Sequence, residues 1–301
     1  MKISNTPLVS VIMPSYNGAR FIEEALFSAL NQKYPNMEFI VVNDASTDAT
    51  SEIIMALQEK DERITLLNNP SNQGIAKSRN IWATVAKGEY IAVLDCDDIW
   101  IDPYKTDKQV SFLKKNPDTG FVGTNSITKM LRQGNPIYYK SNRDKSDKKI
   151  RENILSICPF LHSSVVYKNM YDTIGWYPED ILYADDYGYW LKAGKYTKFA
   201  NIPDYTTLYH SRHDNTSQTH HWHQLKESIK LSWKHRNDYS NTIKYLAQKP
   251  YYVSRSLLAK HLEKHFPCLK DEISKMIGRP AYNSFQDNDE ISRLMINVQK
   301  G

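Results

Sequence analysis

The chain has 301 residues, 41% of them hydrophobic and 24% charged, which is an ordinary composition for a folded α/β protein. No apolar run approaches the roughly 20 residues that a membrane-spanning helix requires. The formal charge of +5, from 39 basic and 34 acidic residues, is too small for a dedicated nucleic-acid binder, so no nucleic-acid partner is expected.

The first strands and helices alternate along the chain. Leu8 to Met13 is predicted as a short buried strand, which the turn-rich run from Pro14 to Gly18 ends. Apolar residues then recur at helical spacing from Phe21 to Leu30. A second strand is predicted from Glu38 to Asn43, and a polar turn that starts at Asp44 follows it.

The same alternation continues to residue 94. A second helix is centred on Ile53 to Leu57, and a short third strand spans Arg63 to Leu67. Gln73 to Lys87 is predicted as a helix and Glu89 to Leu94 as the next strand. This pattern predicts an α/β fold with a mostly parallel sheet flanked by helices, in which ligands bind beyond the carboxyl ends of the strands.

The remaining two thirds are less regular. From Pro103 to about Tyr205 helix and strand patterns are mixed, and from Trp222 onward the pattern is mainly helical. Cys96, Cys158 and Cys268 are far apart and form no CxxC pair, so they indicate neither a disulfide framework nor a thiolate zinc site.

Carboxylates follow two of the predicted strands. Asp44 comes after the second strand, and Asp95, Asp97 and Asp98 come after the strand that ends at Leu94. Such carboxylates, held by rigid strand ends, supply the hard oxygen ligands that Mg²⁺ or Mn²⁺ prefers and leave positions open for a diphosphate. The alternative is a turn or helix cap, where aspartate is also common.

Eight ordered segments resemble a known family. They are VSVIMPSYNGARFIEEALFSALNQ, FIVVNDASTDAT, NQGIAKSRN, GEYIAVLDCDD, HSSVVYKNM, IGWYPED, ADDYGYWLKAG and YHSRHDNTS. In this order they resemble the family 2 glycosyltransferases with the GT-A fold, over roughly Pro7 to Ser217. The resemblance implies a GT-A domain at residues 1–220, with a nucleotide-sugar-binding half at 1–102 and an acceptor-binding half at 103–220. A helical C-terminal extension would occupy residues 221–301.

The resemblance also implies which residues bind the nucleoside of the donor. Pro14 and Tyr16 would border the base, and Asp44 would accept a hydrogen bond from a uracil-type ring. Gly74 and Arg79 would lie near the ribose and the diphosphate.

The metal and the diphosphate would be held by a second group. By the resemblance, Asp95 would face the ribose or the metal, Cys96 would belong to the same nucleotide-sugar site, and Asp97 would be the main metal ligand of the DxD motif. His213 would approach the metal or the diphosphate from the far side, and His210 stands where the family often has Arg.

The resemblance assigns the catalytic base to Asp186, in the sequence Asp185-Asp186-Tyr187. Inverting transfer needs a base that takes the proton of the acceptor hydroxyl while its oxygen attacks the anomeric carbon opposite the leaving diphosphate. The metal would stabilise the charge that develops on that diphosphate. From the residues alone, both acids could instead lie at a helix N-terminus and satisfy backbone donors.

Three residues are candidates for an acceptor or sugar pocket: His162, Asp185 and Trp190. His162 could equally be a buried residue at the start of a strand, with its ring bonded to the backbone. Aromatic residues such as Trp190 are more often part of the core.

These features predict an inverting, metal-dependent glycosyltransferase with Mn²⁺ or Mg²⁺ as cofactor. It would transfer a hexose or N-acetylhexosamine from a UDP-sugar to a saccharide or lipid-linked saccharide, in bacterial surface polysaccharide, O-antigen or lipooligosaccharide biosynthesis. The alternatives are a non-catalytic sugar-nucleotide-binding or scaffolding subunit and a nucleotidyltransferase. A nucleotidyltransferase is expected to carry a basic Gly-rich loop after the first strand, which Pro14 to Gly18 lacks.

The N-terminal apolar stretch is too short for a secretory signal, which predicts a cytoplasmic protein. Residues 222–252 are rich in Lys, His, Tyr and Trp. They could form an amphipathic surface that contacts anionic lipid at the inner face of the membrane, or a solvated helical cap.

Overall fold

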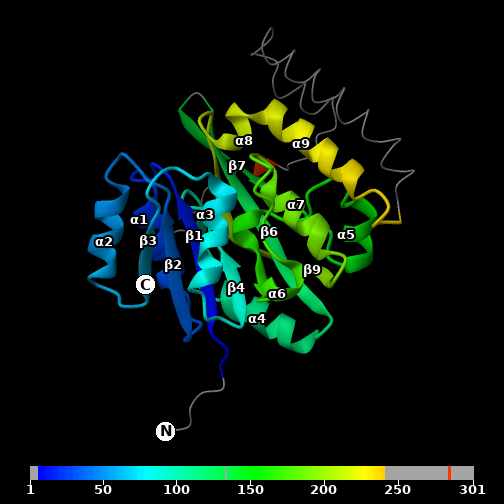
Figure 1. Cartoon of the computed structure of the whole chain (residues 1–301), viewed down its shortest axis with the longest axis horizontal. Coiled ribbons are helices and arrows are strands. Elements are labelled where there is room, and N and C mark those ends of the chain that lie inside the picture. The colour runs from blue at the N-terminus through cyan, green and yellow to red at the C-terminus, as the bar shows by residue number, and fades with distance from the viewer. Residues whose placement is uncertain (1–5, 133, 241–283, 286–301) are drawn as a thin grey trace.

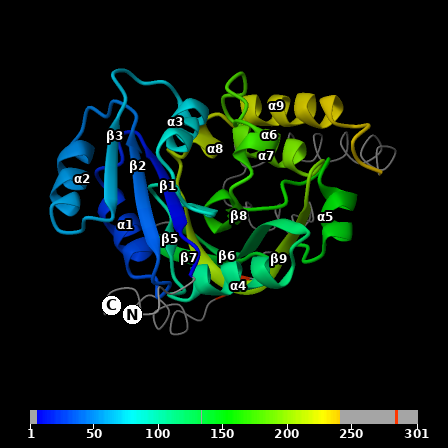
Figure 2. The same cartoon turned by 60° about the horizontal axis from the view of Figure 1, so that its bottom comes forward.

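The computed structural model describes residues 6–132, 134–240 and 284–285 (Figure 1). One mixed sheet runs through this part of the chain. Helices cover both of its faces, as Figures 1 and 2 show. Among the described residues, no helix is both long enough and apolar enough to cross a membrane.

The N-terminal half supplies four strands that pair in parallel in the spatial order β3-β2-β1-β4. These strands are β1 (Val9–Ser15), β2 (Met37–Asn43), β3 (Ile64–Asn68) and β4 (Tyr90–Val93). The helices between them are α1 (Ile22–Leu30), α2 (Thr50–Gln58) and α3 (Ile75–Ile81). The predicted helix over residues 73–87 is shorter than expected, because a 3-10 turn, Trp82–Thr84, follows α3.

Side chains of β1 alternate between two cores. Val9, Val11 and Met13 pack with apolar residues of α1 and α2 on one face of the sheet. Ile12 packs on the other face, in the core that includes Ala76 of α3. Because both faces are covered, the strand is apolar almost throughout, as parallel strands usually are.

The second half contributes longer and more irregular elements. Its strands are β5 (Ile99–Trp100), β6 (Thr119–Arg132), β7 (Asn135–Lys140), β8 (Val166–Lys168), β9 (Lys198–Ser211) and β10 (Ser284–Phe285). Its helices are α4 (Lys105–Lys115), α5 (Asp147–Asn153), α6 (Tyr171–Ile174), α7 (Asp185–Ala193), α8 (Thr216–Thr219) and α9 (His221–Lys234). A 3-10 turn, His162–Ser164, precedes β8.

Strand β8 joins the two halves of the sheet. It pairs antiparallel with β4 on one side and with β6 on the other. β6 pairs in parallel with β9 past several irregularities of register, while β5, β7 and β10 form antiparallel pairs. β8 therefore extends the parallel sheet beyond β4 with a strand of opposite direction, and the two halves share one continuous sheet.

The predicted α/β fold class is confirmed, and its parallel part is the strand set β3-β2-β1-β4 together with the pair of β6 and β9. The predicted helical extension begins with α9. Residues 241–283 and 286–301 lie outside the described residues, and the two residues between them form β10. The predicted domain limits at residues 102 and 220 stay predictions.

Candidate active site

The loops that follow β1, β2 and β3 meet at one edge of the sheet. The backbone N–H of Asp44, after β2, donates to the carbonyl of Ser15 at the end of β1 (2.8 Å). The N–H of Asn69, after β3, donates to the carbonyl of Asn43 (2.9 Å). The sheet thus brings together the strand ends at which the sequence predicts a nucleotide site.

Asp44 organises one side of this edge. Its Oδ1 accepts hydrogen bonds from Asn69 Nδ2 (2.6 Å) and from the backbone N–H of Gln73 (2.8 Å), and its Oδ2 accepts one from the N–H of Gly74 (2.9 Å). Gly74 has a φ of +85°, a conformation that a glycine adopts without strain. Asp44 and Gly74, both predicted as nucleotide-binding residues, therefore lie together, and Asp44 holds the loop of residues 69–74 in place.

A second set of bonds joins the loops after β1 and β2. The N–H of Gly18 donates to Thr50 Oγ1 (2.8 Å), and the N–H of Ala19 donates to Asp48 Oδ2 (3.0 Å). Asn17 Oδ1 accepts from the N–H of Thr47 (2.8 Å). Hydrogen bonds from Thr50 and from the backbone outweigh burial and lower the pKa of Asp48. Sequence reasoning missed these residues, whose signal was a pair of polar turns after adjacent parallel strands.

The residues predicted to border the base differ in exposure. Tyr16 is 50% exposed at the tip of the joined loops, where a base could stack on its ring. Pro14 is a buried residue of β1 and pairs with Val42 of β2. Tyr16 is therefore the residue of the two whose ring is open to a ligand.

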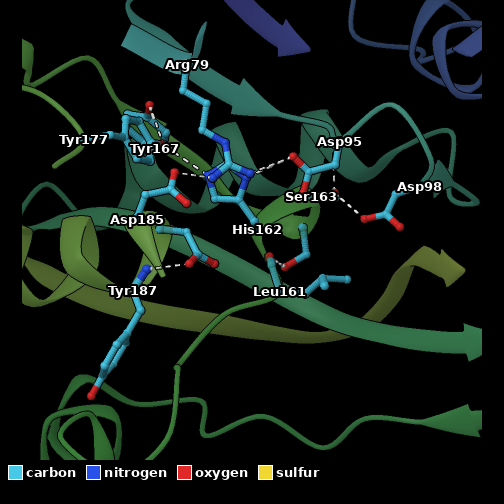
Figure 3. A network of polar contacts seen from close by, with 12 residues as sticks. Arg79, Asp95, Asp98, Leu161, His162, Ser163, Tyr167, Tyr177, Asp185 and Tyr187 are labelled. Atoms are coloured by element: carbon cyan, nitrogen blue, oxygen red, sulfur yellow. Dashed lines mark hydrogen bonds and ion pairs between the residues drawn. The ribbon is translucent and has the colours of Figure 1, made fainter. Parts of the chain in front are cut away.

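Arg79 joins the two halves of the site (Figure 3). It lies on α3 and is 4% exposed. Its Nη2 is 2.9 Å from Asp95 Oδ1 after β4, and its Nη1 is 2.5 Å from Asp185 Oδ2 at the start of α7. The two carboxylates outweigh burial and raise the pKa of Arg79. The guanidinium that was expected at the ribose and diphosphate is thus engaged by two acids of the protein.

Asp95 has its charge balanced within this network. Arg79 and His162 outweigh the effect of burial and hold the pKa of Asp95 far below its usual range. His162 is 4% exposed, with Nδ1 3.6 Å from Asp95 Oδ1 and Nε2 3.2 Å from the hydroxyl of Tyr177. His162 therefore lies buried beside Asp95, beneath the site that was predicted to hold the sugar.

The other two acceptor-pocket candidates have positions that differ from the prediction. Trp190 is fully buried, and its ring packs edge-on against Phe121 and Phe160 in the core. Asp185 is 4% exposed, with its carboxylate bonded to Arg79. Helix α7 is buried over most of its surface, so both side chains face the interior of the fold.

Asp186 differs from its neighbour. It is half-buried, and its Oδ1 accepts a hydrogen bond from the N–H of Tyr187 (2.7 Å). Burial and the adjacent charge of Asp185 raise its pKa. A carboxylate with a raised pKa and without an ion-pair partner among the described contacts is a suitable proton acceptor.

The DxD segment follows β4 and is held at several points. Ser163 Oγ accepts from the N–H of Asp95 (3.1 Å) and donates to Asp98 Oδ2 (2.5 Å). The carbonyl of Asp97 is 2.8 Å from His210 Nδ1, and Asp97 Oδ2 is 2.9 Å from Nη2 of Arg212. Asp95 and Asp97 are both partly exposed, with side-chain exposures of 28% and 24%, whereas Asp98 is buried and turned inward.

The charges of this segment suit a divalent cation. Burial and the neighbouring carboxylates raise the pKa of both Asp97 and Asp98. No cluster of three metal-ligating side chains occurs within the described ranges. The carboxylates thus fit a cation such as Mn²⁺ or Mg²⁺, which Asp97 would bind through a carboxylate oxygen.

The role predicted for His213 at the metal or the diphosphate stays a prediction. His213 is exposed, and Arg212 is the residue that contacts Asp97. His210 and Arg212 are two residues apart at the end of an extended strand and so share a face, on which both reach Asp97. This alternation along β9 was the signal that would have identified Arg212.

Cys96, predicted to belong to the nucleotide-sugar site, packs against the loop after β1. Its Sγ would lie 3.2 Å from a Cβ added at Gly18, where Ser15 Oγ would be 2.6 Å away. Burial raises the pKa of the Cys96 thiol to about 12, so it stays protonated. The close approach explains why the loop after β1 has a glycine at this point.

Comparison with known proteins agrees with this geometry. The model of the family described as Glycosyl transferase family 2 matches residues 10–172. An uncharacterized glycosyltransferase of Haemophilus influenzae is 29% identical over 258 residues, which cover 80% of this chain and 77% of the relative. The UDP-Glc:alpha-D-GlcNAc-diphosphoundecaprenol beta-1,3-glucosyltransferase WfgD of Escherichia coli is 44% identical over 120 residues, which cover 40% of this chain and 46% of that enzyme.

A solved structure has the same fold. The mannosyltransferase PcManGT of Pyrobaculum calidifontis, in complex with GDP-Man and Mn²⁺, has a TM-score of 0.65 to this chain. The two are 19% identical, and the match covers 98% of this chain and 87% of PcManGT. At this identity the likeness shows a shared GT-A fold.

Proposed function

The chain belongs to glycosyltransferase family 2 and is a glycosyltransferase, and from this premise we propose that it is an inverting, metal-dependent enzyme. Its donor is a UDP-sugar that carries a hexose or N-acetylhexosamine. Its acceptor is a saccharide or lipid-linked saccharide of bacterial surface polysaccharide, O-antigen or lipooligosaccharide biosynthesis. Family membership disfavours the nucleotidyltransferase, and the half-buried Asp186 with its raised pKa favours an enzyme over a non-catalytic subunit of the same fold.

One observation carries the proposal. Arg79 ion-pairs with Asp95 in the donor half and with Asp185 on the helix that presents Asp186. The metal-binding segment and the proposed base are therefore held by one buried guanidinium. In an inverting transfer the base and the leaving group act on opposite faces of the sugar, so their segments must keep a fixed separation, and the two ion pairs of Arg79 support this.

The reaction assigns each of these residues a task. Asp186 takes the proton of the acceptor hydroxyl as that oxygen forms its bond to the anomeric carbon. The bond from the anomeric carbon to the diphosphate oxygen breaks, and UDP leaves. The divalent cation, when bound at Asp97, supplies Lewis-acid stabilisation of the diphosphate charge. The ion pairs of Arg79 with Asp185 and Asp95 fix the position of α7 relative to the DxD segment, so that Asp186 stays beside the reacting hydroxyl.

Two of the compared proteins support the choice of ligands. The name of the E. coli relative states a UDP-Glc donor and a GlcNAc-diphosphoundecaprenol acceptor. The P. calidifontis structure contains Mn²⁺. These properties support a UDP-sugar, a lipid-linked acceptor and Mn²⁺ or Mg²⁺ for this chain as well.

We place the enzyme in the cytoplasm, at the inner face of the membrane. Helix α9 supports this placement, because it exposes Lys226, Lys230 and Lys234 at four-residue intervals and carries Trp222 and Trp233 near its ends. Co-sedimentation with vesicles tests the idea. Binding that requires anionic phospholipid is expected, and equal binding to neutral vesicles would contradict it.

Nucleotide release tests the proposed reaction. The chain is incubated with UDP-, GDP- and dTDP-sugars, with acceptor, and with Mn²⁺ or a chelator. Release of UDP from a UDP-hexose or UDP-N-acetylhexosamine that depends on acceptor and on Mn²⁺ is expected. A preference for GDP- or dTDP-sugars, or full activity in the chelator, would overturn the proposal.

A further inference from the structure

Arg212 is held in an unusual place, directly after β9 and against the proposed metal ligand. Its Nη2 is 2.9 Å from Asp97 Oδ2, and its Nε is 3.0 Å from Asp214 Oδ1. The guanidinium carbon lies 4.0 Å from the centre of the Phe21 ring. The two ion pairs and the ring contact fix the plane of the guanidinium beside the DxD segment.

One nitrogen of this guanidinium has no acceptor within the described structure. Nη1 of Arg212 is buried and makes no hydrogen bond. A buried N–H without a partner is costly, so this atom favours the arrival of an anionic oxygen. The diphosphate of the donor is the anion expected at this strand end, and arginine recognises such oxygens with two parallel N–H groups.

The two acids on Arg212 differ in how firmly they hold it. Asp214 is 71% exposed in its side chain, so its pair with Arg212 is weak in water. Asp97 is 24% exposed and is the stronger partner. A divalent cation that binds Asp97 takes away this partner and competes with the guanidinium for the same carboxylate.

We propose that Arg212 is an internal cation that couples metal binding to diphosphate binding, an inference that rests on the function proposed above. In the free enzyme the guanidinium pairs with Asp97 and opposes the binding of a metal alone. When metal and nucleotide bind together, the carboxylate of Asp97 binds the metal in place of Arg212, and the guanidinium donates hydrogen bonds to diphosphate oxygens. Metal and UDP therefore strengthen each other's binding, and Arg212 is the origin of part of this coupling.

The test measures Mn²⁺ binding without any turnover. Free Mn²⁺ is followed by electron paramagnetic resonance, with and without UDP, for the wild type and for Arg212→Gln. The variant is expected to bind Mn²⁺ alone about fivefold more tightly, and its gain in Mn²⁺ affinity on adding UDP is expected to be at least fivefold smaller. Unchanged Mn²⁺ affinity, or the same gain from UDP as in the wild type, would overturn the inference.

Two further variants complete the experiment. Arg63→Gln is the matched control, because Arg63 also pairs with an acid, Asp61, at 2.7 Å and lies 5.2 Å from the ring of Phe39, away from the site. It is expected to bind like the wild type. Arg212→Lys keeps the charge but loses the planar fork, and its gain in Mn²⁺ affinity on adding UDP is expected to lie between those of the wild type and Arg212→Gln. If the glutamine variant does not fold, the full wild-type gain in Arg212→Lys would overturn the inference. If the wild type binds neither Mn²⁺ nor UDP, the proposed function fails. If the wild type binds both and the Arg212 variants bind them in the same way, this inference alone fails.

Discussion

Two adjacent carboxylates at the start of α7 have different surroundings. Asp185 is buried and accepts a charge-assisted hydrogen bond from Arg79, so its charge is neutralised inside the fold. Asp186 is half-buried and bonds to the N–H of the next residue. These surroundings support the proposal that Asp185 positions helix α7 and that Asp186 is the base.

The raised pKa of Asp186 predicts an unusual pH profile. The base works only when deprotonated, so kcat/KM falls as the pH drops through the pKa of Asp186, which lies above the ordinary aspartate value of about 3.9. Asp185→Asn removes the neighbouring negative charge and is expected to move this acid limb to lower pH. The profile is measured from pH 4 to 8, with Asp172→Asn, an exposed acid of α6, as control. An acid limb that stays in place would exclude Asp186 as the titrating group.

Arg79→Lys is expected to impair catalysis more than donor binding. Lysine is a point charge and cannot pair with Asp95 and Asp185 in the geometry of the guanidinium fork, so Asp186 is displaced. A displacement of about 1 Å can reduce kcat on the order of 100-fold. Steady-state kinetics and UDP titration separate the two effects. A large loss of UDP affinity at unchanged kcat would instead put Arg79 on the diphosphate, as the sequence predicted.

The positions of most acids of the site were predictable from the sequence, because Asp44 and the acids of the DxD segment follow apolar strands, whereas Asp48 was missed. The roles of the basic residues were not predictable. Arg79 and Asp185 are 106 residues apart in the chain, and Arg212 and Asp97 are 115 apart. Which cation meets which acid depends on where β4, α7 and β9 lie in space, and the sequence pattern does not contain that information.

At the scale of elements, the loops after β1 and β2 act as one unit. Asp48→Ala removes the acceptor of the Ala19 N–H and of Thr50, and is expected to cost about 1 kcal/mol of stability. The affinity for UDP is also expected to fall, because the loop that carries Tyr16 loses the hydrogen bond from the Ala19 N–H to Asp48. Calorimetric UDP titration and urea unfolding measure both, with Glu52→Ala on the exposed side of α2 as control. Wild-type UDP affinity in Asp48→Ala would contradict this role.

Helix α4 begins with a buried amine that is a source of instability. Lys105 is fully buried, and its Nζ has no hydrogen-bond partner among the described residues and lies 4.0 Å from the ring centre of Trp100. Burial lowers the pKa of this amine to about 7. In the unfolded chain the same amine keeps its proton up to about pH 10.4. The unfolded state therefore binds more protons between these values, and stability rises with pH across this window by about 1 kcal/mol per pH unit.

Lys105→Met is expected to stabilise the protein at pH 7 and to abolish this rise. Urea unfolding at pH 7, 8 and 9 measures it. Lys114→Met, at an exposed position of the same helix, is the control and is expected to keep the rise. If the wild type shows no rise from pH 7 to 9, the amine is charged and solvated in the native state, contrary to this account.

The strands that pair in parallel in the N-terminal half were predictable from the sequence, whereas the pairing of β6, β8 and β9 was not. The regular alternation in the first hundred residues predicts β1 to β4, since each strand is a continuous apolar run covered on both faces. β8 has three residues and takes its direction from β4 and β6, so its antiparallel pairing has no local signal. The bulged pairing of β6 with β9 is equally a product of tertiary contact.

At the scale of the whole molecule, the shared sheet and the Arg79 network connect the four parallel N-terminal strands with the second half of the chain. Ser163 strengthens this connection, because it lies just before β8 and bonds to both Asp95 and Asp98 of the DxD segment. A donor bound at the carboxyl ends of the parallel strands is thus placed against α7 by rigid elements. In this arrangement different residues bind the nucleotide and accept the proton, so a substitution can remove proton transfer and leave nucleotide binding intact.

The most direct test of the account is acceptor-dependent UDP release by Asp186→Asn, measured on samples whose UDP affinity is determined in parallel. The account predicts wild-type UDP affinity and a loss of transfer by a factor of about 100 to 10,000, because the amide cannot take the proton. Near-normal transfer by Asp186→Asn would contradict the account.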